Sequence, residues 1–318
     1  MNATEDRRIA TVVIPAYNGA RLLGHTLDSL AAQTVGPIDV IVVDDGSTDE
    51  TVDVASAHPV VTRVIRQEHH GVAVARNRGL AVADTSWIGF VDQDDLWHRE
   101  RLETLLLLAE TTGALAVATT ELPFAVVTDR EALAAIGDGR DDWPQRWIAP
   151  GAEDDLFSSP EPFGSGEVST ISAGRLMQGA AMLTTAVLYD RETAIAAGGF
   201  APHARALDDH VLNINLARIT GPIPRVDSKQ LLYRVHPEST STVSPMVGPF
   251  LSMQAAMRLG GMPDMDAGIG PNVEHLLYNL HRSGLSARDQ RALLELTVPY
   301  DQRWRWRMRW LARRWRIR

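Results

Sequence analysis

The sequence predicts an α/β fold in which a mostly parallel, Rossmann-like sheet is flanked by helices. Short apolar runs rich in β-branched residues alternate with segments of helical spacing over residues 11–109. Loops rich in Asp, Tyr or Asn follow the apolar runs, at the strand ends where ligands of such sheets gather. With 318 residues and a hydrophobic content of 45%, the chain has room for one large domain with an appendage.

The predicted elements follow one another in strict alternation. Strands are expected at residues 11–14, 38–43, 60–65 and 87–91, and helices at 21–33, 51–57, 72–83 and 102–109. Ser47 and Glu50 have the spacing of a helix capping box, and Asp95 is most simply explained as a helix cap. Residues 111–175 are less regular, and we expect a variable insertion there.

Composition excludes several kinds of site. The chain has no cysteine, so any metal must be held by oxygen or imidazole. The N-terminus is polar, and no apolar run approaches the roughly 18 residues of a membrane span, so we expect a cytoplasmic location, soluble or peripheral at the inner membrane face. The net charge of -9 includes an arginine-rich end, so the body is more acidic still and a nucleic-acid partner is not expected.

Asp92 and Asp94 are the first candidates for chemistry. In extended chain, carboxylates two residues apart project to the same side, and here they follow a predicted buried strand. Hard oxygen ligands suit Mg²⁺ or Mn²⁺, which keep coordination positions for a diphosphate. Taken alone, an Asp-x-Asp pair is more often a turn than a metal site.

Several motifs together resemble glycosyltransferase family 2. They are VVIPAYN at 12–18, VVDDGSTD at 42–49, GVAVARNRG at 71–79, FVDQDDLW at 90–97, GGF at 198–200, LDDH at 207–210 and YRVHP at 233–237 with Ser239 and Ser241. The resemblance covers about residues 9–110 and 180–242, and it implies an inverting enzyme of GT-A fold. The family usually has Glu-Asp where this chain has Asp208-Asp209.

The resemblance implies a nucleotide-sugar site. Pro15, Ala16 and Tyr17 would line the nucleoside pocket, with the tyrosine stacking near the base. Asp45 would accept a hydrogen bond from the base N–H, which favours uracil or thymine. Arg76 would lie over the base or the phosphates.

It also implies the metal and catalytic residues. Asp92 would approach the ribose and the metal, beside Gln93 in the donor site, and Asp94 would be the principal ligand of Mn²⁺ or Mg²⁺. Asp209 would be the general base, and His236 would contact the metal or the diphosphate.

Each of these residues also has a plain structural explanation. Asp45 can begin a turn and Asp209 can be an acid favoured by a helix N-terminus. Arg76 can be a surface residue on a helix, and His236 a loop histidine before a proline. His69 and His70 look like exposed loop residues and are assigned no role.

The function expected from these motifs is metal-dependent, inverting sugar transfer from a UDP- or TDP-sugar to an acceptor hydroxyl. The acceptor would be a glycan, glycolipid or small molecule, in the assembly of cell-surface glycan, polysaccharide or glycolipid. One alternative is a catalytically inactive module that binds a nucleotide sugar. A sugar-1-phosphate nucleotidyltransferase ranks lower, because it needs a glycine-rich basic loop where this chain has Pro-Ala-Tyr-Asn-Gly-Ala.

The C-terminal part divides into two further segments. We expect a transferase domain over 1–245, a helical extension over 246–300 and a basic Trp/Arg tail over 301–318. Tryptophan interleaved with arginine over 303–318 favours a peripheral contact with anionic membrane. Docking of this tail on an acidic protein surface is an equal alternative, and stacking on single-stranded nucleic acid a weaker one.

Overall fold

The computed structural model describes residues 8–136, 144–160, 164–177, 182–202 and 208–239. The expected helical extension over 246–300, the Trp/Arg tail and Ser241 lie outside these residues. Within them, no helix combines the length and the apolar character needed to cross a bilayer.

Strands and helices alternate through the first half of the chain, as predicted. This half contains β1 (Ala10–Ala16), α1 (Ala20–Ala31), β2 (Asp39–Asp44), α2 (Thr51–Ala57), β3 (Arg63–Arg66), α3 (Val72–Val82), β4 (Trp87–Phe90), β5 (Leu96–Trp97), α4 (Arg101–Thr112) and β6 (Ala116–Val126). The described residues after it form α5 (Arg130–Ile136), β7 (Arg146–Ile148), α6 (Glu153–Phe157), β8 (Val168–Ile171), α7 (Ala173–Met177), β9 (Val187–Asp190), α8 (Arg191–Ala196), α9 (Asp208–Thr220) and β10 (Ile223–Arg234).

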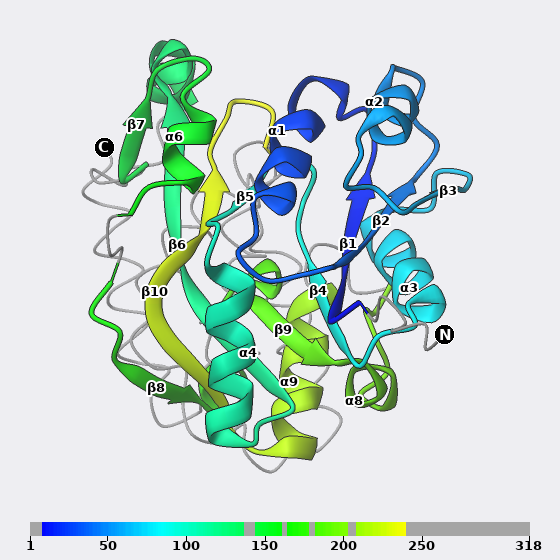
Figure 1. Cartoon of the computed structure of the whole chain (residues 1–318), viewed down its shortest axis with the longest axis vertical. Coiled ribbons are helices and arrows are strands. Elements are labelled where there is room, and N and C mark those ends of the chain that lie inside the picture. Colours follow the sequence, from blue (N-terminus) through cyan, green and yellow to red (C-terminus); the bar gives the residue numbers. More distant parts are fainter. Residues whose placement is uncertain (1–7, 137–143, 161–163, 178–181, 203–207, 240–318) are drawn as a thin grey trace, which may run out of the picture.

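The strands form one mixed, mostly parallel sheet, which confirms the predicted fold class. Its order is β3-β2-β1-β4-β9-β6-β10-β5, with β7 paired to β6 and β8 paired to β10. β1 lies parallel to β2 and β4, and β6 lies parallel to β10. β9 runs antiparallel to both of its neighbours and therefore joins the two parallel groups. The carboxyl ends of β1 and β10 point toward the same edge, at the top of Figure 1.

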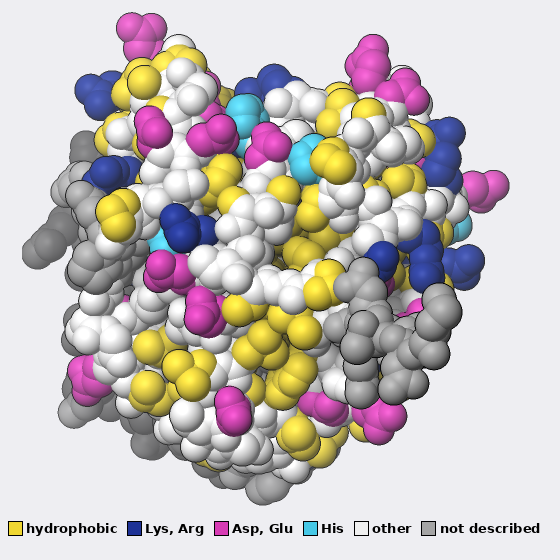
Figure 2. Space-filling view, viewed as in Figure 1, with side chains coloured by type: hydrophobic (Ala, Val, Ile, Leu, Met, Phe, Trp, Pro, Cys, Tyr) yellow, Lys and Arg dark blue, Asp and Glu magenta, His cyan; other side chains and the backbone are white. Residues whose placement is uncertain are grey.

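Hydrophobic side chains alternate between the two faces of the sheet. Val12 and Ile14 of β1 pack with α1, α2 and α4, whereas Val13 packs with α3, α7, α8 and α9. Helical spacing orients α4 in the same way: Leu102 and Leu105 are buried, and Leu107 is 59% exposed. Figure 2 shows hydrophobic side chains gathered on the face that α4 covers, with charges of both signs around them.

Residues 111–175 contribute more to the sheet than the sequence indicates. We expect a variable insertion there, but β6 lies inside the sheet, between β9 and β10. Its sequence AVATTELPFAV carries Glu121 and Pro123, which interrupt the apolar run that identifies a buried strand. Later in the chain, β10 extends to Arg234, so Tyr233 and Arg234 are its last two residues.

The two helix-cap predictions are wrong. The N-cap of α2 is Glu50 and its side chain makes no capping bond. Ser47 instead accepts a hydrogen bond from the backbone N–H of Asn18 (2.9 Å), which commits its hydroxyl to a neighbouring loop. Asp95 precedes β5 rather than a helix, is 1% exposed, and accepts the backbone N–H of Arg234 (2.9 Å). Both side chains thus bond to parts of the chain that are distant in sequence, rather than to the end of a helix.

The strand order creates a crevice at one edge of the sheet. From β1 the chain proceeds outward on one side through β2 and β3, and then returns to place β4 on the other side of β1. Loops after neighbouring strands that lead in opposite directions leave a cleft between them, at the carboxyl ends of the strands. The cleft between the loops after β1 and β4 is where the candidate site lies.

Candidate functional site

A cleft of about 660 Å³ opens at the carboxyl ends of β1, β2, β4 and β10. All ten residues singled out from the sequence line it: Pro15, Ala16, Tyr17, Asp45, Arg76, Asp92, Gln93, Asp94, Asp209 and His236. Other lining residues include Asn18, Gly19, His69, Leu183, Thr184, Thr185, Asp208, Tyr233 and Ser239. The fold therefore gathers seven separate parts of the chain around one space, although their individual roles stay predictions.

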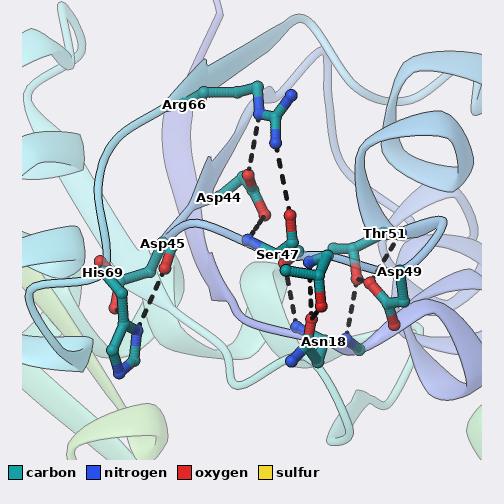
Figure 3. Close-up of polar contacts among 10 residues, drawn as sticks. Asn18, Asp44, Asp45, Ser47, Asp49, Thr51, Arg66 and His69 are labelled. Carbon is teal, nitrogen blue, oxygen red and sulfur yellow. Dashed lines mark hydrogen bonds and ion pairs between the residues drawn. The ribbon is translucent and has the colours of Figure 1, made fainter.

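The loop after β2 is held rigidly beside the loop after β1 (Figure 3). Asp44 accepts bonds from the backbone N–H of Ser47 (3.2 Å) and from Nε of Arg66 (3.1 Å). Asn18 donates its N–H to Ser47 and accepts the N–H of Thr48 (2.9 Å) through its side-chain oxygen. Asn18 adopts a positive φ of 47°, which asparagine tolerates better than most residues. These bonds fix the edge of the cleft on which Tyr17 and Asp45 lie.

Tyr17 and Asp45 both contact His69, a residue to which the sequence assigned no role. The rings of Tyr17 and His69 stack with centroids 4.1 Å apart. Nδ1 of His69 lies 2.9 Å from Oδ2 of Asp45. His69 follows β3 on the same sheet edge as the other loops, and that position was the signal that could have identified it.

The carboxylate of Asp45 accepts three hydrogen bonds. They come from Nε2 of Gln67 (2.8 Å) and from the backbone N–H groups of His70 (2.9 Å) and Gly71 (2.8 Å). Burial would raise the pKa of Asp45, but the hydrogen bonds from His70, Gln67 and Gly71 and the charge of His69 outweigh it. The pKa of Asp45 therefore lies below its usual value.

Gln93 secures the backbone of Tyr17. Its side-chain oxygen accepts the N–H of Tyr17 (2.8 Å) and its NH₂ group donates to the carbonyl of Tyr17 (3.1 Å). Gly19 lies so close that a Cβ there would overlap the amide of Gln93. The sequence predicts that Gln93 contacts the bound nucleotide sugar. In the structure its amide also joins the loop after β4 to the loop after β1.

Arg76 lies between two carboxylates and lines the cleft. Its guanidinium donates to Oδ1 of Asp92 (2.6 Å) and to Oδ2 of Asp208 (3.2 Å), and it is almost fully buried. Burial alone would lower the pKa of Arg76, but the charges of the two aspartates outweigh it and raise the pKa. Burial raises the pKa of Asp208 to about 6, against the opposing charge of Arg76. Arg76 therefore joins the Asp92 loop to the start of α9.

Asp92 and Asp94 reach the cleft through a tight turn, not through extended chain as predicted. The N–H of Asp95 donates to the carbonyl of Asp92 (3.1 Å) and closes this turn. Oδ2 of Asp94 lies 2.9 Å from Nε2 of His236, which comes from the chain after β10. The loops after β4 and β10 thus place a carboxylate and an imidazole side by side.

The donor set around Asp94 fits a divalent cation that is shared with a substrate. Among the described residues, no group of three or more His, Asp or Glu side chains forms a complete metal site. Mg²⁺ is usually held by one or two protein carboxylates, with phosphates and water completing its shell. Asp94 and His236 supply two donor atoms that lie 2.9 Å apart, and Asp92, whose Oδ1 bonds to Arg76, lines the same cleft. An oxygen-rich ligand would have to complete the shell.

Arg234 holds the turn formed by residues 92–95 in position. Its Nε donates to the carbonyl of Asp94 (2.9 Å), and Nη1 donates to Oε1 of Glu153 (3.0 Å), which is itself buried. Its guanidinium lies 4.8 Å from the ring centroid of Phe124. Burial raises the pKa of the adjacent Asp95 well above its usual value, and the charges of Asp94 and Asp92 add to this effect.

The first turn of α9 provides the remaining acid. Asp208 is 4% exposed and points to Arg76, whereas Asp209 is less buried and lines the cleft. Oδ1 of Asp209 accepts the backbone N–H of His210 (2.7 Å). Burial raises the pKa of Asp92 against the charge of Arg76, and the charges of Asp94 and Asp209 add to this increase.

Comparison with known proteins identifies the family of this segment. The profile described as Glycosyl transferase family 2 matches residues 11–146, which carry the loops after β1, β2 and β4. Residues 11–146 are thus similar to glycosyltransferase family 2. The resemblance noted in the sequence is thereby confirmed.

Curated proteins named as glycosyltransferases match about a third of the chain. "Uncharacterized glycosyltransferase YibD" of Escherichia coli is 37% identical over 34% of this chain and 32% of its own length. "Amylovoran biosynthesis glycosyltransferase AmsB" of Erwinia amylovora is 38% identical over 31% of this chain and 35% of its own length. The "PGL/p-HBAD biosynthesis glycosyltransferase" of Mycobacterium tuberculosis is 42% identical over 32% of this chain and 41% of its own length. The chain thus matches less than half the length of these relatives.

Solved structures support the GT-A fold over most of the chain. Staphylococcus aureus TarS 1-349 in complex with UDP-GlcNAc gives a TM-score of 0.56 at 17% identity, covering 90% of this chain and 70% of TarS. The mannosyltransferase PcManGT of Pyrobaculum calidifontis, in complex with GDP-Man and Mn²⁺, gives 0.55 at 18% identity, covering 91% and 79%. At these identities the likeness shows the fold alone.

Proposed function

We propose that this chain transfers a sugar from a nucleoside-diphosphate donor to an acceptor hydroxyl with inversion at the anomeric carbon. The observation that carries the proposal is the distribution of groups along one cleft. This cleft is lined by Tyr17 and Asp45, by Asp94 and His236, which lie 2.9 Å apart, and by Asp209. A ring and a carboxylate suit a base, the Asp94 pair suits a metal diphosphate, and a separate carboxylate suits a proton acceptor.

The residues of this chain have distinct tasks in the proposed reaction. Asp209 takes the proton of the acceptor hydroxyl as its oxygen attacks the sugar opposite the leaving diphosphate. Asp94 and His236 would hold Mn²⁺ or Mg²⁺, with Asp92 oriented beside them by Arg76. A cation bound there would neutralise the charge that develops on the departing diphosphate. Because the hydroxyl attacks directly, inversion needs no protein nucleophile.

The proposed donor is a UDP- or TDP-sugar. An Asp45 carboxylate near Tyr17 suits the N–H of uracil or thymine. TarS was solved with UDP-GlcNAc and PcManGT with GDP-Man and Mn²⁺, so proteins of this fold bind different donors of one chemical class. The acceptor we propose is a glycan, glycolipid or small-molecule hydroxyl. Relatives named for amylovoran and PGL/p-HBAD biosynthesis suggest a role in polysaccharide or glycolipid assembly.

Asp209→Asn tests the proposed chemistry. The amide keeps the shape of the carboxylate but takes no proton, so we expect donor binding to persist and release of nucleoside diphosphate to fall about 100-fold or more. Binding is measured by calorimetry, and release is measured from UDP- and TDP-sugars with Mn²⁺ in an acceptor extract. The matched control is Asp53→Asn, an exposed first-turn acid of α2 outside the cleft.

Two results would contradict the assignment of Asp209. Unchanged release in Asp209→Asn would reduce this residue to an acid that merely favours the start of α9. Donor binding by the wild type without release in any acceptor mixture would instead support a nucleotide-sugar-binding module.

A further inference from the structure

His69 makes, within the protein, the two contacts that the proposed function assigns to the nucleobase. A base bound as proposed would stack on Tyr17 and donate an N–H to Asp45. The imidazole of His69 stacks on Tyr17 with centroids 4.1 Å apart and rings inclined by 29°. Its Nδ1 lies 2.9 Å from Oδ2 and 3.1 Å from the backbone oxygen of Asp45. Figure 3 shows the ring turned toward Asp45.

The His69 ring lies beside a carboxylate that already accepts three hydrogen bonds. The carboxylate of Asp45 offers about four lone-pair positions and accepts from Gln67, His70 and Gly71. Nδ1 of His69 lies 2.9 Å from Oδ2, and the side chain of Asp45 is only 4% exposed. The His69 ring thus occupies the space beside Oδ2 that a base N–H would need.

His69 contacts Asp45 through its side chain, and that side chain is also the one that stacks on Tyr17. His70 and Gly71 donate through backbone N–H groups at the start of α3, where Gly71 also accepts the N–H groups of Val74 and Ala75. The His69 side chain is 57% exposed and is joined to the site by these contacts only at its ring.

The backbone of His69 is fixed while its side chain can rotate. A Cβ on Gly46 would lie 3.0 Å from the backbone nitrogen of His69, so the two loops are in close contact. Gly46 has a φ of 85°, which favours glycine and permits this approach. Release of the ring therefore requires rotation about the side-chain bonds of His69 and no movement of the loop.

We propose that His69 occupies the base subsite of the unliganded protein and is displaced when a pyrimidine nucleoside diphosphate binds. This inference rests on the proposed function, because it takes the Tyr17–Asp45 end of the cleft as the base site. The His69 contacts must be broken before a base can bind, so they reduce donor affinity. His69 thereby sets the concentration of donor that the protein needs.

Removing the imidazole should strengthen nucleotide binding. In His69→Ala, UDP no longer competes with a stacking contact and a hydrogen bond, so we expect its Kd to fall about fivefold. Calorimetric titration with UDP and Mn²⁺ measures it. The matched control is His70→Ala, since the His70 side chain is also 57% exposed but its ring does not line the cleft. We expect its Kd to equal that of the wild type within about twofold.

A second measurement uses the unaltered protein. The ring-proton NMR signals of His69 should shift when saturating UDP removes the ring from the face of Tyr17, while those of His70 change little. Unmoved His69 signals at saturation would overturn the proposal.

The possible failures are distinguishable. If UDP binds the wild type but binds His69→Ala equally well or more weakly, the displacement of His69 is refuted and the proposed transferase function stands. If UDP, TDP, GDP and ADP bind neither protein, both proposals fail together. Binding by His69→Ala that exceeds wild-type binding supports both.

Discussion

Arg76 joins two acidic parts of the cleft. It is nearly fully buried and bonds to Asp92 from the loop after β4 and to Asp208 from the start of α9. Removing one partner of a buried ionic group leaves uncompensated charge, which costs far more than losing an exposed pair. The sequence placed Arg76 in the site, but only the fold could reveal that its partners are protein carboxylates.

Arg76→Ala should destabilise the protein strongly. Two buried carboxylates would lose their shared cation, and we expect the free energy of unfolding in urea to fall by about 3–5 kcal/mol. Arg21→Ala is the control, because Arg21 pairs with Glu238 at the surface, where the two side chains are 63% and 77% exposed. That variant should unfold almost like the wild type. Equal losses in the two variants would show that the buried bridge has no special weight.

At the scale of elements, β10 and the turn after β4 form one unit. Arg234 of β10 donates its backbone N–H to Asp95 and its Nε to the carbonyl of Asp94, while Glu153 of α6 pairs with its Nη1. His236, two residues further along, contacts Asp94. The geometry of the Asp94–His236 pair is thus set by strand pairing and by a buried ion pair rather than by the local sequence.

A double-mutant cycle at Arg234 and Glu153 tests this unit. Each residue compensates the charge of the other in a buried position, so Arg234→Gln and Glu153→Gln should each destabilise the protein. The double variant should lose less than the sum of the two, with a coupling energy of about 1–3 kcal/mol measured by urea unfolding. Strict additivity would mean that the two side chains act independently and that Arg234 holds the turn without Glu153.

The elements that could be predicted are those whose apolar pattern in the sequence is enough to identify them, whereas the missed ones depend on contacts with distant parts of the chain. The strands from β1 to β4 and the helices between them could be predicted, because their apolar residues follow the strand and helix periods without interruption. β6 could not, since Glu121 and Pro123 break its pattern and its position depends on pairing with β9 and β10. The capping role expected for Ser47 failed for a related reason, because Asn18 from another loop uses its hydroxyl.

At the scale of the whole molecule, the cleft exists because the strand order reverses beside β1. Pro15 and Ala16 end β1, and the other sequence-predicted site residues lie in loops or helices at the same edge of the sheet, so all ten line one space. The motifs could be recognised one by one, but their convergence depends on the fold. His69 was missed because its partners, Tyr17 and Asp45, are brought to it only by the sheet.

The most direct measurement of the central claim is metal-dependent release of nucleoside diphosphate from UDP- and TDP-sugars in the presence of an acceptor extract. We expect the wild type to release it with Mn²⁺ or Mg²⁺, and we expect a chelator to stop release. Asp94→Asn should reduce release about 100-fold or more, because it removes a charged ligand from the proposed cation site. Asp84→Asn, whose side chain is 87% exposed outside the cleft, should behave like the wild type. Release that survives both the chelator and Asp94→Asn, or no release from any of these donors, would contradict the account.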